Sequence, residues 1–287
     1  NLVFKEKSKF LRMFYCFFSC LGTVGLLPLT TLGLIGRLYV QRWKNDIVCV
    51  SPKNSHITYT NKLTLMTHNV QLSEYRSMNV IDDDFTTQKR CEIWFEWFSK
   101  LNEHPLIFGL QELFDPEAAD YLANKLSMEG YWVCYSCKPV GHGIGMGSGL
   151  LLASRIPMIN VGFRPYEYCS GDGKWANKGV LGAMLDYGVY NIMALVTHSQ
   201  AGLGNTGGHH HEVDKEVNFG ENMEIDKFIK DFSTIEPNVT FLMGDLNKAS
   251  IQSNMNNTSY DVNDNYWLLE NLEKLGWKNL TCESDEE

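Results

Sequence analysis

Four short apolar runs in this sequence each end at polar residues, and this recurrence constrains the fold more than any other feature. The clearest run is Phe241-Leu-Met-Gly-Asp-Leu-Asn247, which is too short for a helix. It ends with a carboxylate, Asp245, and a carboxamide, Asn247, two residues apart. Residues at this spacing in a strand point to the same side, so both could contact one metal ion or phosphate. Taken alone, the run could equally end in an ordinary capped turn.

The other three runs also end at residues that can bind metal ions or exchange protons. In chain order they end at His68 and Asn69, at Gln111 and Glu112, and at Thr197, His198, Ser199 and Gln200. Oxygen ligands suit Mg²⁺, which proteins bind through one or two carboxylates together with a substrate phosphate. An imidazole can donate to or accept from reacting oxygens near neutral pH. The four runs therefore predict a Mg²⁺-assisted phosphoester hydrolase, although each residue alone could be an ordinary loop residue.

The hydrophobic pattern predicts many strands and few helices. Strands are predicted over residues 62–70, 106–110, 131–135, 149–153, 180–186, 190–197 and 239–243. Helices are predicted over residues 85–101, from Asp115-Pro116 onward, and over residues 213–232. The three histidines at 209–211 follow two glycines and are interpreted as part of a loop. This content favours an α/β fold of two packed sheets flanked by helices over a single Rossmann-type sheet.

Charge and hydropathy divide the chain into three regions. Residues 1–44 carry seven Lys or Arg and one acid, a charge of +6, and subtracting this from the net −9 leaves −15 for residues 45–287. The acidic remainder argues against a nucleic-acid partner, whereas the basic end suits a phospholipid surface, including anionic lipids. We expect residues 1–44 to be a membrane segment, 45–60 a polar linker, and 61–287 the catalytic domain.

The membrane prediction depends on an uncharged stretch of 24 residues, from Met13 to Gly36. Its length suffices to cross a bilayer, but Pro28 and four glycines weaken a helix. A spanning helix, an interfacial or re-entrant segment and a cleaved signal peptide remain open, and membrane attachment is favoured. The eight cysteines lack the spacing of a disulfide framework, so we expect the catalytic domain on the cytosolic side. Acylation of Cys16 or Cys20 is an open alternative to simple packing.

Six short motifs occur in a fixed order along the chain. They are Thr67-His68-Asn69-Val70, Leu110-Gln111-Glu112, Ser148-Gly149-Leu150-Leu151, Lys178-Gly179, Thr197-His198-Ser199-Gln200-Ala201 and Gly244-Asp245-Leu246-Asn247. This order resembles the endonuclease/exonuclease/phosphatase superfamily, and within it most resembles membrane-attached neutral sphingomyelinases. The resemblance covers about residues 61–250. It implies a DNase I-like four-layer α/β sandwich of two packed β-sheets flanked by helices.

The resemblance also implies roles for individual residues. Glu112 would be the principal Mg²⁺ ligand, assisted by Asn69. Asp245 and Asn247 would hold and orient the phosphate and the attacking water. His198 would hydrogen-bond the phosphoryl oxygens in the transition state.

A lysine completes the set that the resemblance implies. Lys178 would add positive charge near the phosphate, although a surface lysine before a strand is the alternative. The family form also has an aspartate shortly before this lysine, as a switch partner. Asp172 is the nearest candidate, but its spacing from Lys178 is offset.

The sequence departs from the family pattern near its end. The superfamily's water-activating Asp-His pair lies after the Gly-Asp-x-Asn box, whereas His211 is the last histidine here and 40 residues follow Asn247. The chain also begins at Asn1 without a methionine. We therefore expect a fragment truncated at both ends, which lacks the general base and the closing strands and is inactive or poorly folded alone.

Three functions remain open from the sequence. The first is a membrane-bound phosphodiesterase that hydrolyses sphingomyelin to ceramide and phosphocholine. The second is a phosphoinositide phosphatase or a nuclease of the same superfamily. The acidic charge argues against the nuclease, and the lack of a basic cluster after Asn247 argues against the phosphatase. The third is a catalytically inactive, membrane-associated binding module.

Overall fold

The computed structural model describes residues 47–54, 62–72, 86–136, 147–168, 176–200, 209–232, 235–247 and 277–278. The predicted membrane segment over residues 1–44 and the candidate switch partner Asp172 lie outside these ranges. Among the helices of the described residues, none is both long and apolar enough to cross a bilayer.

The described strands form two sheets. The first sheet has the order β1-β4-β5-β3-β2 and contains β1 (Val48–Val50), β4 (Trp132–Tyr135), β5 (Leu151–Ser154), β3 (Ile107–Leu113) and β2 (Leu65–Leu72). The second sheet has the order β6-β7-β8-β9 and contains β6 (Met158–Pro165), β7 (Gly179–Tyr187), β8 (Tyr190–His198) and β9 (Val239–Asp245). Each sheet has one parallel pair, β2 with β3 and β8 with β9, and its other pairs are antiparallel.

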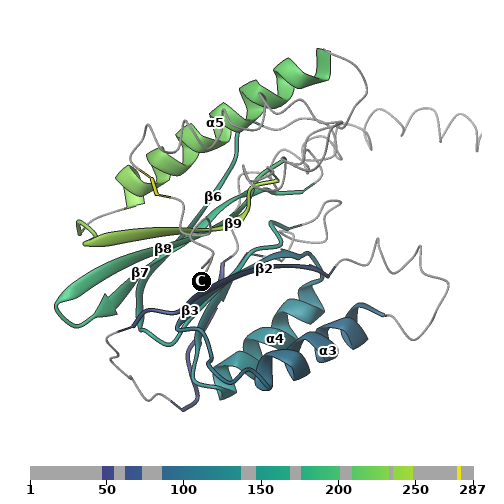
Figure 1. The fold of residues 1–287 in the computed structure, drawn as a ribbon, viewed down its shortest axis with the longest axis vertical. Coiled ribbons are helices and arrows are strands. Elements are labelled where there is room, and N and C mark those ends of the chain that lie inside the picture. Colours follow the sequence, from purple (N-terminus) through teal and green to yellow (C-terminus); the bar gives the residue numbers. More distant parts are fainter. Residues whose placement is uncertain are drawn as a thin grey trace, which may run out of the picture.

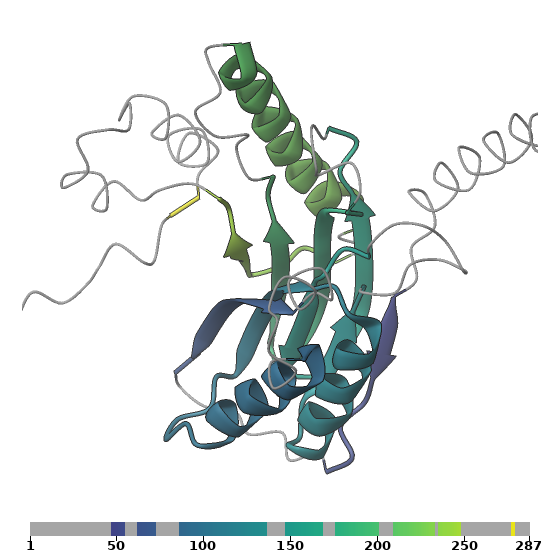
Figure 2. The same ribbon diagram turned by 90° about the vertical axis from the view of Figure 1, so that its right-hand side faces the viewer.

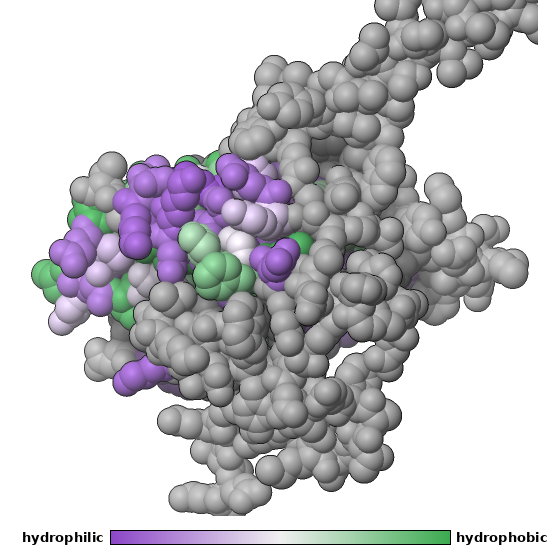
Figure 3. All heavy atoms as spheres, turned by 90° about the horizontal axis from the view of Figure 1, so that it is seen from above, coloured by the Kyte–Doolittle hydropathy of each residue, from purple (hydrophilic) through white to green (hydrophobic). Residues whose placement is uncertain are grey.

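Three helices of the described residues cover the outer faces of the two sheets. Helices α3 (Thr87–Ser99) and α4 (Pro116–Met128) lie on the first sheet, and α5 (His209–Phe232) lies on the second (Figures 1 and 2). Seen from the α5 side, the coloured surface is mainly hydrophilic with a few hydrophobic spots (Figure 3). The layers are helix, sheet, sheet and helix, which confirms the predicted α/β sandwich.

Side chains on alternate faces of the central strands fill the spaces between the layers. In β3, Phe108 and Leu110 belong to the core beneath α3 and α4, while Ile107 belongs to the core between the sheets. In β8, Val196 faces the first sheet and Leu195 faces α5. Both faces of these central strands are therefore buried, which explains their continuous apolar sequences.

The helix starts agree with their sequence signals. The Asp115 side chain accepts hydrogen bonds from the backbone N–H groups of Glu117 (2.8 Å) and Ala118 (3.3 Å), and Pro116 follows as the first helical residue. Thr86 caps α3 in the same way by accepting from the N–H of Lys89 at 3.2 Å. Both caps satisfy donors that have no partner within the helix.

Two strands and several element boundaries differ from the sequence predictions. Strand β1 lies in the segment 45–60 that we interpreted as a linker, yet it pairs antiparallel with β4, so these residues belong to the sheet. Strand β6 was also missed, because it is an edge strand with exposed positions and a final proline and shows no apolar run. Strand β3 continues through Glu112 to Leu113, beyond the predicted end at Leu110. Helix α5 includes the three histidines at 209–211, which we had placed in a loop.

Replacing Gly109 with alanine is expected to lower the free energy of unfolding by about 1–3 kcal/mol. Gly109 lies where β3 crosses β8, and an added Cβ would be 2.5 Å from Cγ2 of the fully buried Val196. Val196 is β-branched and has little rotameric freedom to move away. Urea denaturation of Gly109→Ala, Val196→Ala and the double variant measures the effect. The double variant should lose less stability than the sum of the single losses, and additive losses would contradict the clash.

Candidate active site

The parallel pair of each sheet ends at the same place in the sandwich. In the first sheet, His68 and Asn69 of β2 lie opposite Leu110 and Gln111 of β3. In the second sheet, the last residues of β8 and β9, His198 and Asp245, are register partners. Strand β9 also packs against β2 and β3 of the other sheet. The ends of two parallel pairs therefore meet across the interface between the sheets.

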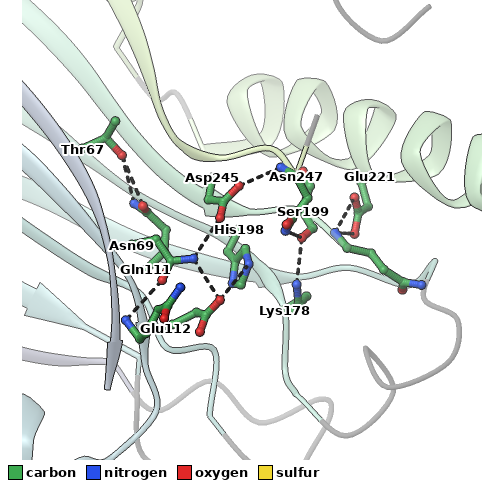
Figure 4. Close-up of polar contacts among 12 residues, drawn as sticks. Thr67, Asn69, Gln111, Glu112, Lys178, His198, Ser199, Glu221, Asp245 and Asn247 are labelled. Carbon is green, nitrogen blue, oxygen red and sulfur yellow. Dashed lines mark hydrogen bonds and ion pairs between the residues drawn. The ribbon is translucent and has the colours of Figure 1, made fainter. Parts of the chain in front are cut away.

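A hydrogen-bonded amide joins two carboxylates at this meeting point. The Nδ2 of Asn69 donates to Oε1 of Glu112 at 2.9 Å and to Oδ2 of Asp245 at 2.8 Å (Figure 4). Its Oδ1 accepts from the backbone N–H of Gln71 at 3.2 Å, which fixes the orientation of the amide. Because Asn69 and Glu112 belong to the first sheet and Asp245 to the second, this amide connects the two sheets.

The site is rich in unusual backbone conformations. Among the described residues, the non-glycine residues with positive φ are Gln71 (52°), Glu112 (57°) and Asn247 (53°), and all three belong to the site or follow it directly. Such conformations cost of order 1–3 kcal/mol each and persist where the surroundings enforce them. At Glu112 the left-handed residue interrupts the regular strand geometry just where its carboxylate meets Asn69.

His198 is buried beside the two carboxylates. It is 4% exposed, and its Nε2 lies 3.9 Å from Oε1 of Glu112, which is too long for a hydrogen bond. Burial, and then the charge of Lys178, lower the pKa of His198 to about 4, against the opposing effect of Asp245. The imidazole is therefore neutral at pH 7. Its buried Nδ1 has no hydrogen-bond partner among the described residues.

The three charged or basic groups of this cluster fit a divalent cation. Ligand atoms of Glu112, His198 and Asp245 all lie within 4.8 Å of one another. Two carboxylates at this separation repel each other. The Asn69 amide donates to both, the N–H of Asn247 donates to Asp245, and Lys178 is a nearby positive charge. The orphaned ring nitrogen of His198 adds a further polar atom that requires a partner. The two carboxylates and the adjacent imidazole are a donor set that can hold a hard divalent cation.

A second group of donors lies next to the carboxylates and converges on one backbone carbonyl. Lys178 precedes β7, and its Nζ donates to the carbonyl of Ser199 at 2.7 Å. The Nδ2 of Asn247 donates to the same carbonyl, also at 2.7 Å. Burial lowers the pKa of Lys178, although the nearby carboxylates, Glu221 first, act in the opposite direction. The site thus combines a negative cluster with a buried cation and a carboxamide at its side.

The structure brings together six of the seven residues singled out in the sequence. They are Asn69, Glu112, Lys178, His198, Asp245 and Asn247, and the seventh, Asp172, lies outside the described residues. Their individual roles stay predictions.

Two local details differ from the sequence reasoning. Asp245 and Asn247 do not continue one extended strand, because Asn247 is left-handed and its N–H donates to Oδ1 of Asp245 at 2.8 Å. This turn, rather than strand alternation, brings the two side chains to one place. Asn69 also presents its Nδ2 to the carboxylates, whereas a metal ligand would use Oδ1.

Sequence reasoning missed two groups that support the site. One is the Ser199 carbonyl, because a backbone acceptor leaves no trace in the residue type. The other is Glu221 of α5, which accepts from the backbone N–H of Gln200. Its signal was present, since Glu221 falls on the apolar stripe formed by Val217, Ile225 and Phe228, where an acid is out of place.

Solved structures of other proteins share this architecture. Sphingomyelinase C from Streptomyces griseocarneus is 20% identical over 66% of this chain and 65% of its own, with a TM-score of 0.51. A β-hairpin deletion mutant of beta toxin from Staphylococcus aureus is 19% identical over 74% and 73%, with a TM-score of 0.56. A beta toxin mutant with bound magnesium ions, also from Staphylococcus aureus, is 19% identical over 73% and 70%, with a TM-score of 0.54.

The similarity is one of structure, not of sequence. No family model matches the chain, and no curated protein is a significant match. The chain spans just under two thirds of the length of the Streptomyces sphingomyelinase. At identities of one fifth or less, these similarities establish the fold. The resemblance inferred from the six motifs is confirmed at this level: the chain has the DNase I-like α/β fold, similar to that of sphingomyelinase C and beta toxin.

Proposed function

We propose that the chain contains part of the catalytic domain of a Mg²⁺-dependent phosphodiesterase that hydrolyses sphingomyelin to ceramide and phosphocholine. One observation carries the proposal: Glu112, His198 and Asp245 bring their ligand atoms within 4.8 Å of one another. A buried lysine and a carboxamide lie beside them. A cation next to donors for phosphoryl oxygens is the arrangement that phosphoester hydrolysis requires.

Glu112 and Asp245 would hold the Mg²⁺, which would neutralise charge on the phosphate in the transition state. The beta toxin structure with bound magnesium ions supports this choice of metal. Asn69 would keep the two carboxylates in place through its bonds of 2.9 Å and 2.8 Å. Asp245 is fixed from a second side, because its Oδ1 accepts from the N–H of Asn247.

Three side chains would bind the phosphate and the attacking water. A lysine ammonium has three donors, so the bond from Lys178 to Ser199 leaves it capacity for a phosphoryl oxygen. The neutral imidazole of His198 would donate its N–H to a second oxygen. Asn247, together with Asp245, would hold the phosphate and orient the attacking water. Because His198 is buried, these bonds would form where water competes little with them.

The choice of substrate rests on two supports. The structural similarity to sphingomyelinase C favours sphingomyelin over the other phosphoesters of the superfamily. The basic, apolar segment over residues 1–44 would attach the domain to a membrane, where such a lipid is found. We place the domain on the cytosolic side of that membrane.

Replacing Glu112 with glutamine is expected to weaken Mg²⁺ binding at least tenfold, or by about 1.4 kcal/mol. Glutamine keeps an oxygen that can accept the Asn69 bond, so the main change is the loss of one negative charge. Isothermal titration calorimetry of the protein with MgCl₂ measures the affinity. Glu117→Gln is the matched control, since Glu117 is an exposed acid at the start of α4. Equal affinities of the two variants would exclude Glu112 as a ligand.

The product of the complete gene is expected to release phosphocholine from sphingomyelin vesicles only when Mg²⁺ is present. His198→Ala should reduce kcat by about 10²–10³-fold, the usual effect of removing one donor to a developing negative charge. Parallel assays with phosphoinositide vesicles and with DNA test the alternatives. Hydrolysis of DNA alone would refute the proposed substrate. Hydrolysis of none of the three, with Mg²⁺ still bound, would favour an inactive binding module.

A further inference from the structure

A buried carboxylate of α5 lies behind the candidate active site. Glu221 is 1% exposed, and acidic side chains are rarely buried to this degree unless they are hydrogen-bonded or paired. Its Oε1 and Oε2 accept from the backbone N–H of Gln200 at 3.1 Å and 3.3 Å (Figure 4). The helix thereby holds the segment that follows β8.

The N–H group of Gln200, which donates to Glu221, belongs to the same peptide unit as the Ser199 carbonyl. A peptide unit is planar, and in its trans form the N–H and C=O point in opposite directions. Fixing the N–H of Gln200 therefore also fixes the direction of the Ser199 carbonyl. That carbonyl accepts from Nζ of Lys178 and from Nδ2 of Asn247, both at 2.7 Å. One peptide plane thus connects α5 with two side chains of the site.

The preceding peptide, between His198 and Ser199, is also held by a hydrogen bond. The N–H of Ser199 donates to the carbonyl of Asp245 at 3.0 Å, which continues the pairing of β8 with β9. Rotation of the next peptide about the Ser199 backbone would break the bond to Glu221, so this bond restrains that rotation. The negative charge of Glu221 also favours the protonated form of the buried Lys178.

We propose that Glu221 is a positioning residue: it orients the Ser199–Gln200 peptide so that the Ser199 carbonyl holds Lys178 and Asn247 in place to bind a phosphate. This inference rests on the proposed function, because it assumes that both side chains contact the substrate phosphate. Glu221 itself touches no reacting atom.

Two substitutions of Glu221 distinguish the effect of its hydrogen bond from the effect of its negative charge. Glu221→Ala removes the acceptor, whereas Glu221→Gln keeps a side-chain oxygen that can accept the Gln200 N–H. Glu224→Ala is the matched control, because Glu224 is a second buried acid on the same helix (6% exposed) and faces Arg164 at 3.9 Å instead. Thermal unfolding of all variants identifies any loss of activity that results from lower stability alone.

Amide hydrogen exchange at Gln200 reports the positioning directly. Glu221→Ala should accelerate this exchange at least tenfold, whereas Glu221→Gln and Glu224→Ala should keep it within about threefold of wild type. With sphingomyelin, Glu221→Ala should lower kcat by about 10- to 100-fold, the scale expected for a misplaced group. Glu221→Gln should restore most of kcat. If Glu221→Ala frees the Gln200 amide but leaves kcat and KM at the values of Glu224→Ala, or if Glu221→Gln is as impaired as Glu221→Ala, the proposal is wrong.

A second probe separates this proposal from the proposed function. If the wild-type protein hydrolyses none of the three substrates, the proposed function fails. Binding of inorganic phosphate in the presence of Mg²⁺ can still be measured, and we expect it to depend on Lys178 and Asn247. Glu221→Ala should then weaken phosphate binding about tenfold, and Glu221→Gln should not. Equal phosphate affinity of wild type and Glu221→Ala would overturn the positioning role.

Discussion

The hydrogen bonds of one amide, Asn69, hold together a site whose parts come from two separate sheets. Hydrophobic packing alone brings the sheets into contact, but it is not directional and sets no particular distance between Glu112 and Asp245. Two like charges at this place would push the strand ends apart. The Asn69 Nδ2 donates to both carboxylates and so sets their separation. His198 pairs with Asp245 between β8 and β9, and the turn at Asn247 is closed by its N–H bond to Asp245.

The sequence predicted the convergence of the site because of a simple topological reason. Asn69 and Glu112 follow apolar runs that form one parallel pair, and His198 and Asp245 follow runs that form the other. Parallel strands bring their carboxyl ends to one edge of a sheet, so polar residues at those ends must gather. The layers could be predicted for a different reason. Strands that are buried on both faces have continuous apolar sequences.

The features that could not be predicted from the sequence depend on contacts that the residue types alone do not indicate. Strand β1 has three residues and is recognised only by its partner β4. The left-handed conformation of Glu112 is imposed by its surroundings, because glutamate has no intrinsic preference for it. The Ser199 carbonyl, which accepts from two site residues, is a backbone atom that any residue would supply. Glu221 could have been identified, as an acid on the apolar stripe of a helix, but its partner could not.

The place of β1 in the first sheet determines where an external force would enter the domain. Strand β1 forms one edge of that sheet and β2, which carries Asn69, forms the opposite edge. A pull transmitted through residues 1–46 would therefore first load the three-residue ladder between β1 and β4. Strands β5 and β3 lie between that ladder and β2, which carries Asn69. The edge that would bear mechanical tension is thus the one farthest across the sheet from the chemistry.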